Sequence, residues 1–272
     1  MNTDNIPPIE SVWTSAKEEF SNRVGQGHAC MLLGLVLAHL LHDDILARFH
    51  ALPGAWIHGV PYSGKTQLGA TVAALFGSPH SPVFSELVTD AELRRILETP
   101  HSSPVHLDHF QNESASVARI ALLRQPFNRT TSIKGQSATD MTVSQPQHPP
   151  MITGEGRCSD SATASRYLHF SIGGPLAPIP SQWQELEAAR KHFPLVTRQL
   201  LEHRDTWLKL TICSIESIRD SIPPSGIHER TRLASSIAAG VFIAADYILS
   251  GADMTAGEQD ALAWLREHIA NL

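Results

Sequence analysis

Fold class follows from Gly59-Val60-Pro61-Tyr62-Ser63-Gly64-Lys65-Thr66, which matches the pattern G-x-x-x-x-G-K-[ST]. These residues stand between a strand-like run at residues 55–58 and a helix-like run at residues 67–76. In such a setting the turn exposes consecutive backbone N–H groups, and N–H groups at the start of a helix bind phosphate. The sequence therefore predicts a phosphate-binding loop.

The residue types in this loop suit a bound nucleotide. Lys65 adds a positive charge near the β and γ phosphates, and the hydroxyl of Thr66 can ligate Mg²⁺. A glycine turn without a ligand would not need an inward-pointing lysine after its second glycine. We expect ATP and Mg²⁺ as cofactors, bound by the loop and the residue after it: Gly59, Val60, Pro61, Tyr62, Ser63, Gly64, Lys65, Thr66 and Gln67.

The bulk composition favours a soluble, cytoplasmic protein. The chain has 272 residues, of which 42% are hydrophobic, enough for one substantial core with helical flanks. No secretory signal is visible at the N-terminus, and the longest apolar run, residues 29–41, is too short to span a bilayer. The net charge of −6 argues against a whole-surface attraction to nucleic acid but is compatible with a local basic lining.

Cysteine and histidine usage gives no sign of a metal centre. Cys30, Cys158 and Cys213 are far apart and form no C-x-x-C pair, so neither a disulfide framework nor a zinc site is indicated. The 15 histidines are scattered as single residues without an H-E-x-x-H grouping. A reducing compartment fits this pattern best.

Repeated strand and helix units indicate an α/β fold with a largely parallel sheet. We expect a helical N-terminal flank at residues 1–52, a P-loop NTPase core at 53–178 and an all-helical C-terminal region at 179–272. Strands are expected at residues 55–58, 83–86, 104–108, 149–155 and 167–172, with a hairpin at 130–143. Helices are expected at 11–23, 28–49, 67–76, 89–98 with Thr89 or Asp90 as cap, 116–124, 161–166, 182–192, 195–218, 229–251 and 257–271.

Asp108 ends the strand expected at residues 104–108. The helix at 67–76, the strand at 83–86 and the helix at 89–98 lie between the loop and this strand. A carboxylate at this place is where a Walker B group belongs, opposite Thr66 in the Mg²⁺ shell. A few apolar residues followed by aspartate form a weak pattern alone, and a strand-ending turn is the other explanation. The position relative to the loop favours a pair of metal ligands, Thr66 and Asp108.

Taken together, these residues resemble the helicase-like P-loop ATPases of plasmid, phage and integrative-element replication proteins, related to superfamily 3 helicases and often joined to primases. The resemblance covers most of the chain, although only the loop is specific. Its other marks are the apolar helix at 29–46, Leu75-Phe76-Gly77, Val105-His106-Leu107-Asp108, Ile152-Thr153-Gly154-Glu155, Ala164-Ser165-Arg166-Tyr167-Leu168, and the late helix from Arg230-Thr231-Arg232 to residue 249.

One position departs from that family. A glutamate that polarises the attacking water usually follows the Walker B aspartate, whereas His109 follows Asp108 here. Hydrolysis needs a group that positions water, and histidine is a weaker candidate for it. Glu86, at the end of the neighbouring strand, is the substitute we expect, with Glu155 next and Glu113 less favoured.

The resemblance also implies a polar sensor and an arginine. Thr153 and Glu155 are available as the sensor that touches the γ phosphate or the water. Arg166 resembles the arginine that such ATPases offer to a nucleotide, commonly across a subunit interface; Arg157 is the second choice, and a surface salt bridge is the plain explanation for either. The catalytic set is therefore Lys65, Asp108, Glu86 and Arg166.

Related helicases project a basic hairpin into a central pore, and Arg129 and Lys134 occupy that interval here. Two cations give little positive charge for binding single-stranded DNA, and no aromatic residue is present on which bases could stack. A solvated hairpin therefore stays the competing interpretation. The resemblance further implies self-association in a ring, such as a hexamer. Primase or origin-binding activity is expected from separate partners.

Three functions remain open from the sequence. The first is a helicase-like ATPase motor in replication of a mobile element. The second is a nucleotide-dependent assembly or regulatory module, in which His109 marks weak hydrolysis. The third is a small-molecule P-loop kinase, against which the long helical C-terminus and the lack of an arginine-rich lid speak.

Overall fold

The computed structural model describes residues 6–111, 115–130, 132–134, 142–173, 180–224 and 228–269. Its centre is a five-stranded sheet in the order β2-β3-β6-β1-β7, in which every neighbouring pair is parallel. The strands are β1 (Gly54–Gly59), β2 (Val83–Phe84), β3 (His106–Phe110), β6 (Met151–Gly154) and β7 (Tyr167–Ile172). The expected α/β class with a parallel sheet is confirmed.

Helices make up most of the rest. In chain order they are α1 (Ile9–Val24), α2 (Gln26–Ala38), the 3₁₀ turn η2 (His39–Leu41), α3 (His42–Phe49), α4 (Lys65–Leu75), α5 (Asp90–Glu98), α6 (Val117–Arg124), η3 (Gln125–Asn128), α7 (Ser161–Ala164), α8 (Pro180–Arg190), α9 (Pro194–Glu202), α10 (Arg204–Ser221), α11 (Glu229–Ser250) and α12 (Met254–His268). A separate antiparallel pair, β4 (Ser132–Lys134) with β5 (Thr142–Ser144), lies where a hairpin was expected.

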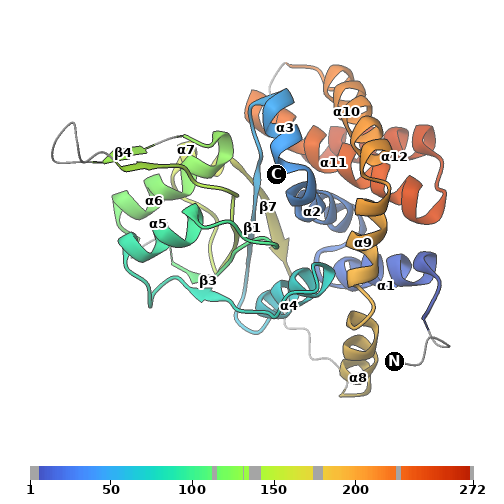
Figure 1. The fold of residues 1–272 in the computed structure, drawn as a ribbon, viewed down its shortest axis with the longest axis horizontal. Coiled ribbons are helices and arrows are strands. Elements are labelled where there is room, and N and C mark those ends of the chain that lie inside the picture. Colours follow the sequence, from blue (N-terminus) through green and yellow to red (C-terminus); the bar gives the residue numbers. More distant parts are fainter. Residues whose placement is uncertain are drawn as a thin grey trace.

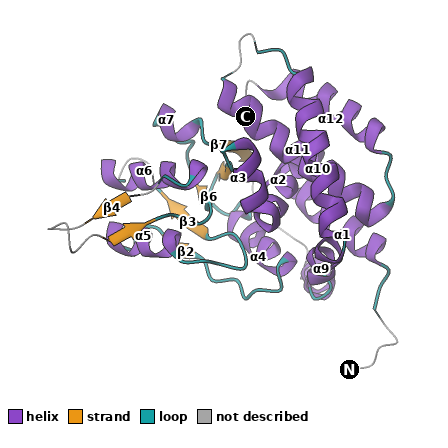
Figure 2. Cartoon of the chain, turned by 45° about the horizontal axis from the view of Figure 1, so that its top comes forward, coloured by secondary structure: helices purple, strands orange, loops and turns teal. Residues whose placement is uncertain are grey.

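The sheet has a helical layer on each face (Figure 1). Side chains alternate along a strand, so Trp56 faces the smaller layer of α5 and α6 while Ala55 and Ile57 face the larger one. The larger layer contains α1, α2, α4 and the helices from α9 onward. Figure 2 shows the same division from a second direction, with β4 beyond α5 and α6, far from the large layer.

Both ends of the chain contribute to the large layer. Trp13 of α1 is fully buried and its Nε1 donates to Asp246 Oδ1 of α11 at 2.6 Å. Lys17 Nζ donates to the same carboxylate oxygen at 2.8 Å. The N-terminal flank and the C-terminal helices therefore share one hydrophobic core with the sheet.

Two expected helices are each divided in the structure. The helix expected at 28–49 is interrupted by the 3₁₀ turn at His39–Leu41, and the one expected at 195–218 ends before His203, whose φ of −108° and ψ of 23° are not helical. Neither break carries a glycine or proline, so the hydrophobic pattern alone could not reveal it.

Among the described residues, two helical segments are long and apolar enough to cross a membrane: Gln26–Phe49 and Glu229–Ser250, each with a mean hydropathy of 1.6. The first is longer than the run at 29–41 considered from sequence. In the fold, 61% and 67% of the apolar 18-residue window within each segment are buried. Core helices of soluble proteins show burial of this kind.

Candidate functional site

The loop at residues 59–66 leaves the carboxyl end of β1 and enters α4. Gly64 adopts a φ of +88°, and a Cβ at this position would lie 2.4 Å from Nη1 of Arg23. Glycine adopts that backbone conformation without steric cost. The second glycine of the motif is therefore required by the turn, whereas the Arg23 guanidinium, at the end of a flexible side chain, could move aside.

The N-terminus of α4 is open to an anion. Within the described part of the chain, no side chain caps this helix and its first turn holds no acidic residue. The first N–H groups of a helix have no intrahelical partner, and the helix dipole places positive potential there. These donors face the cleft and suit a phosphate.

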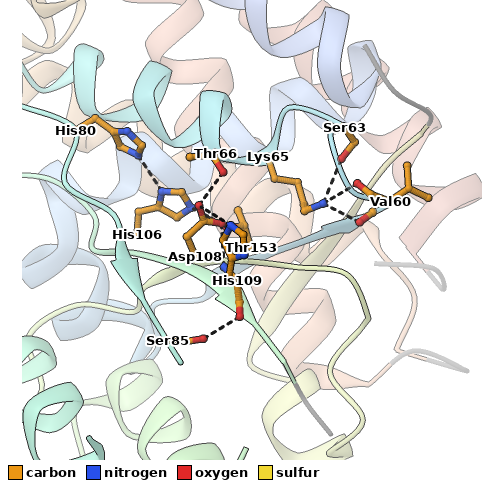
Figure 3. A network of polar contacts seen from close by, with 11 residues as sticks. Val60, Ser63, Lys65, Thr66, His80, Ser85, His106, Asp108, His109 and Thr153 are labelled. Atoms are coloured by element: carbon orange, nitrogen blue, oxygen red, sulfur yellow. Dashed lines mark hydrogen bonds and ion pairs between the residues drawn. The ribbon is translucent and has the colours of Figure 1, made fainter. Parts of the chain in front are cut away.

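Lys65 is held by the loop itself. Its Nζ donates to the carbonyls of Gly59 at 2.7 Å and Val60 at 2.8 Å, and to Ser63 Oγ at 3.3 Å (Figure 3). Burial lowers the pKa of Lys65, while the charges of Glu155 and Asp108 act in the opposite direction. The ammonium group is thus poised over the loop and has to leave these carbonyls to meet an anion.

Asp108 is buried in the middle of β3, which continues to Phe110 and does not end at Asp108 as expected, and it receives several hydrogen bonds. Thr66 Oγ1 donates to its Oδ2 at 2.7 Å, Thr153 Oγ1 to its Oδ1 at 2.5 Å, and the N–H of His109 to Oδ1 at 2.9 Å. Burial would raise the pKa of Asp108, but the hydrogen bonds from Thr153 and Thr66 outweigh it and hold the pKa below its usual value. Thr66 and Asp108 present the hard oxygen ligands that Mg²⁺ takes.

His109 sits on a β-bulge. The pairing of β3 with β6 shifts between Leu107 and Phe110, so β3 carries one extra residue opposite Thr153. His109 takes a φ of +55°, and its carbonyl accepts from Ser85 Oγ at 3.0 Å. Its ring lies 57% exposed, with Nε2 3.9 Å from Asp108 Oδ2. The bulge therefore turns this side chain outward into the cleft beside the carboxylate.

Behind Asp108 lies a buried histidine that the sequence analysis quoted only as part of a strand. His106 Nε2 and Thr153 Oγ1 are 2.8 Å apart, and His80 Nε2 lies 3.1 Å from His106 Nδ1. Burial lowers the pKa of His106 to about 4, against the opposing effect of Asp108. Figure 3 shows these side chains in a row leading to Asp108.

A cleft of about 1280 Å³ opens over the loop. It exceeds the roughly 300–1,000 Å³ that is usual for small-molecule sites. Its walls come from α1, the loop, the ends of β3 and β6, and α8. The residues that argue for a ligand here are Arg23, Lys65, Thr66, Asp108, His109 and Glu155.

Two arginines were missed from sequence: Arg23, which lines the cleft, and Arg190, which packs beside it but outside the residues that line the cleft. Arg23 Nε donates to Glu19 Oε1 at 2.7 Å, and its Nη1 lies 3.5 Å from the carbonyl of Gly64. Arg190 of α8 approaches the same Glu19 oxygen at 3.4 Å and donates to Thr71 Oγ1 at 2.7 Å. Two guanidinium groups share one carboxylate, which leaves net positive charge beside the start of α4. Nothing in the local sequence around either residue signals this meeting.

The three candidate glutamates are treated differently by the fold. Glu155 follows β6 and lines the cleft, where its charge acts on Lys65. Glu86 lies in an exposed turn after β2, near the same edge of the sheet but outside the residues that line the cleft. Glu113 falls outside the described residues. Of these carboxylates the structure brings Glu155 to the site.

Arg166 lies at the amino-terminal ends of the parallel strands, whereas the loop lies at their carboxyl-terminal ends. Its carbonyl accepts from the N–H of Gly54 at 3.2 Å, at the start of β1. Five residues of strand then separate it from the loop, roughly 17 Å at 3.3 Å per residue. Its guanidinium donates to the carbonyl of Ala162 and lies 5.9 Å from the Phe127 ring. The structure does not bring Arg166 to Lys65 within one chain.

Arg157, the second choice, follows β6 at the carboxyl edge of the sheet, on the exposed side of the segment after Glu155. Its positive charge contributes to lowering the pKa values of His58 and His169, behind burial as the main cause. Arg157 is therefore near the end of β1, although it does not line the cleft.

Of the two expected nucleic-acid contacts, Arg129 lies at the base of the β4–β5 pair and Lys134 at its other end. Arg129 Nη1 donates to Asp43 Oδ1 of α3 at 2.7 Å, and the arginine side chain is 20% exposed. This ion pair ties the hairpin base to the large helical layer. Lys134 ends β4, and its side chain lies outside the described part of the structure.

Within the described ranges, no group of three or more His, Cys, Asp or Glu side chains is arranged to hold a metal ion. A divalent ion at Asp108 would therefore rely on the Thr66 hydroxyl, ligand oxygens and water. That sparse protein contribution is the one Mg²⁺ usually has when it accompanies phosphates.

Comparison with known proteins bears on the fold alone. No family profile matches the chain, and no curated protein matches its sequence. Among solved structures, the active helicase Cch of SCCmec type IV is similar, with a TM-score of 0.62 at 11% identity. The match covers 95% of this chain and 51% of that helicase, so the chain spans about half its length. The chain has a helicase-like fold.

Proposed function

We propose that this chain is an ATP-binding and ATP-hydrolysing helicase-like motor that acts in DNA replication of a mobile element. The observation that carries the proposal is the Thr66–Asp108 contact of 2.7 Å beside Lys65 and the open N-terminus of α4. These groups supply the lysine, hydroxyl and carboxylate that a P-loop NTPase uses for Mg²⁺ and the β and γ phosphates.

In this proposal each group has one task. The N–H groups at the start of α4 receive phosphate oxygens, and Lys65 turns from the carbonyls of Gly59 and Val60 to the β and γ phosphates. Thr66 and Asp108 hold Mg²⁺, which would neutralise charge that develops during phosphoryl transfer. Arg23 adds positive charge at the cleft wall, and Arg190 adds positive charge from outside the residues that line the cleft.

The water-orienting group is assigned to Glu155 in preference to Glu86. Glu155 lines the cleft and acts on Lys65, whereas Glu86 is in an exposed turn away from the cleft lining. His109 projects beside Asp108 where the related ATPases carry glutamate. A neutral imidazole can accept a hydrogen bond from water, but it lacks the negative charge that makes a carboxylate a better acceptor.

Arg166 fits a role across a subunit interface. It lies at the amino-terminal ends of the strands, away from the loop of its own chain. It therefore reaches a nucleotide only if a second copy of the chain packs against that end of the sheet. We therefore propose self-association in a ring, with a hexamer as the expected form. Single-stranded DNA, met by the β4–β5 pair with Arg129 and Lys134, and a separate primase complete the proposed partners.

Turnover of ATP with and without single-stranded DNA tests the proposal. Lys65→Ala is expected to abolish turnover and weaken ATP binding at least tenfold, whereas Lys209→Ala, an exposed lysine on α10, serves as the matched control. Glu155→Gln is expected to reduce turnover while ATP binding persists, and Glu86→Gln to leave both unchanged. Unchanged ATP binding and turnover in Lys65→Ala would refute the assignment.

A nucleotide-dependent assembly module is the second candidate. The absence of a carboxylate at position 109 favours binding over rapid hydrolysis. Tight ATP binding that changes the sedimentation of the chain without turnover would select this function over the motor.

A further inference from the structure

A row of buried polar side chains lies behind Asp108. His106, Asp108 and Thr153 are 5%, 1% and 0% exposed, and they project from β3 and β6 toward α4. His80, from the segment between α4 and β2, closes the row at His106. Buried polar groups of this kind are costly unless each finds a partner, so the direction of every hydrogen bond matters.

The donor and acceptor capacities of these side chains fix the direction of each hydrogen bond. An ionised carboxylate only accepts, so Thr153 donates its single proton to Asp108 Oδ1. The Thr153 oxygen is then available as acceptor only, and His106 Nε2 must donate to it. A neutral His106 consequently accepts at Nδ1, where His80 Nε2 is the donor.

This arrangement commits the Thr153 hydroxyl to Asp108. With its proton used there, Thr153 has none left for a phosphate oxygen, unlike the sensor role expected for it from sequence. The Oδ1 atom of Asp108 is occupied by Thr153 and the N–H of His109, and Oδ2 faces Thr66. The carboxylate is thereby oriented with one oxygen toward the cleft.

We propose that His106 is a positioning residue: by donating to Thr153 it keeps the Thr153 hydroxyl on Asp108 Oδ1 and reserves Oδ2 for the divalent ion. This inference rests on the proposed Mg·ATP site. If His106 only filled space, an apolar side chain of similar size would serve equally well. If it positions the carboxylate, a donor at Nε2 is required.

The test measures binding of a fluorescent ATP analogue by the full chain in Mg²⁺ and in EDTA. The ratio of the two affinities reports the contribution of the metal. His106→Leu is expected to lower this ratio about tenfold or more, as loss of an outer partner does at other metal sites, while binding in EDTA stays unchanged. His106→Gln, which keeps an N–H donor of similar reach, is expected to restore most of the ratio.

Thr153→Val tests the same link without altering His106, and it keeps the size of the side chain. It is expected to lower the ratio as His106→Leu does, and the two together are expected to do no more than either alone. This variant carries the test if His106→Leu does not fold. An unchanged ratio in folded His106→Leu or Thr153→Val, or additive losses in the double variant, would overturn the inference.

The two proposals fail in different ways. A wild-type chain that binds the analogue more tightly with Mg²⁺, combined with His106 and Thr153 variants that do the same, overturns only the positioning role. A wild-type chain that does not bind the analogue, or binds it equally with and without Mg²⁺, overturns the proposed site and the inference with it.

Discussion

Gly69 of α4 lies directly against His106. A Cβ at position 69 would come within 2.2 Å of His106 Nδ1 and 2.9 Å of His80 Nε2. The helix that begins at the loop is thus fitted to the histidines that lead to Asp108. A glycine inside a helix costs about 1 kcal/mol relative to alanine, so here close packing outweighs helix propensity.

Gly69→Ala is therefore expected to destabilise the protein by about 1–3 kcal/mol, because overpacking displaces the two imidazoles. Gly257→Ala in α12 is the matched control: its Cβ would meet Ile243 at 3.4 Å, an ordinary contact, so stability is expected to stay level or rise. Urea unfolding of both variants measures the difference. Equal gains at the two positions would contradict the packing argument.

The Glu19 carboxylate competes with any anion for Arg23 and Arg190. Glu19→Gln is expected to strengthen binding of ATP several-fold at low salt, because both guanidinium groups lose their counter-charge. The same change is expected to destabilise the fold by about 2–4 kcal/mol, since it leaves two mostly buried cations unpaired. Fluorescence titration and urea unfolding measure the two effects.

Arg23→Ala is expected to weaken ATP binding, opposite in sign to Glu19→Gln. The control is Glu202→Gln, which breaks the exposed pair with Arg198 and is expected to change neither quantity by more than about 0.5 kcal/mol. Parallel losses of affinity in Glu19→Gln and Arg23→Ala would mean that Glu19 supports the site and does not compete with its ligand.

Stability is expected to fall in mild acid through the histidines packed beside α3. His39 is buried against His148 and His42, with ring centroids 5.4 Å and 4.0 Å apart for His39–His148 and His42–His148. Burial, and then the charge of His42, lowers the pKa of His148 to about 4 from its usual 6.5. The unfolded chain therefore binds more protons between these values, so stability is fully present above pH 6.5 and declines toward pH 4.

Each such histidine contributes a slope of at most about 1.4 kcal/mol per pH unit. Thermal unfolding from pH 7 to pH 4 measures the decline. His148→Gln is expected to reduce the slope by the share of one histidine, because His106 keeps its own lowered pKa, whereas His203→Gln, at an exposed position, is expected to leave the profile unchanged. A steep profile retained in His148→Gln would assign the acid sensitivity to other groups.

The cap at the start of α5 was predicted from the sequence, and its contribution to stability can be measured. Thr89 accepts from the N–H of Glu92 at 3.2 Å, and Glu92 accepts in return from the N–H of Thr89 at 2.8 Å. This capping box bears out Thr89 as the cap. Thr89→Ala is expected to cost about 1 kcal/mol in urea unfolding. Thr89→Ser is expected to restore most of that loss.

Patterns among neighbouring residues in the chain explain which features of the fold and the site could be predicted from the sequence. The loop, the strand before it and the aspartate of β3 follow from turn chemistry and from runs of apolar residues, which depend on neighbours in the chain. Because the loop and Asp108 follow parallel strands of one sheet, these signals also predicted that Thr66 and Asp108 come together, and their 2.7 Å contact agrees with that expectation. The 2.5 Å contact of Thr153 with Asp108 was not predicted, since the resemblance implied a sensor role for Thr153 at the phosphate or the water.

Contacts between residues far apart in the chain explain which features could not be predicted from the sequence. Glu19 and Arg190 are separated by 171 residues, and each looks like an ordinary surface charge on its helix. The bulge that turns His109 into the cleft depends on pairing with β6, so the letters of β3 do not reveal it. Glu86 was preferred over Glu155 for the same reason: only the fold decides which of two strand-end carboxylates lines the cleft.

The Trp13–Asp246 hydrogen bond has a consequence for the order of events on the ribosome. The loop, Thr66 and Asp108 leave the ribosome long before α11, yet α1, which carries one wall of the cleft, cannot dock on α11 until that helix exists. The nascent chain therefore exposes the faces of α1 and α2 that α11 covers until α11 has been made. Closure of the core and completion of the cleft both wait for that helix.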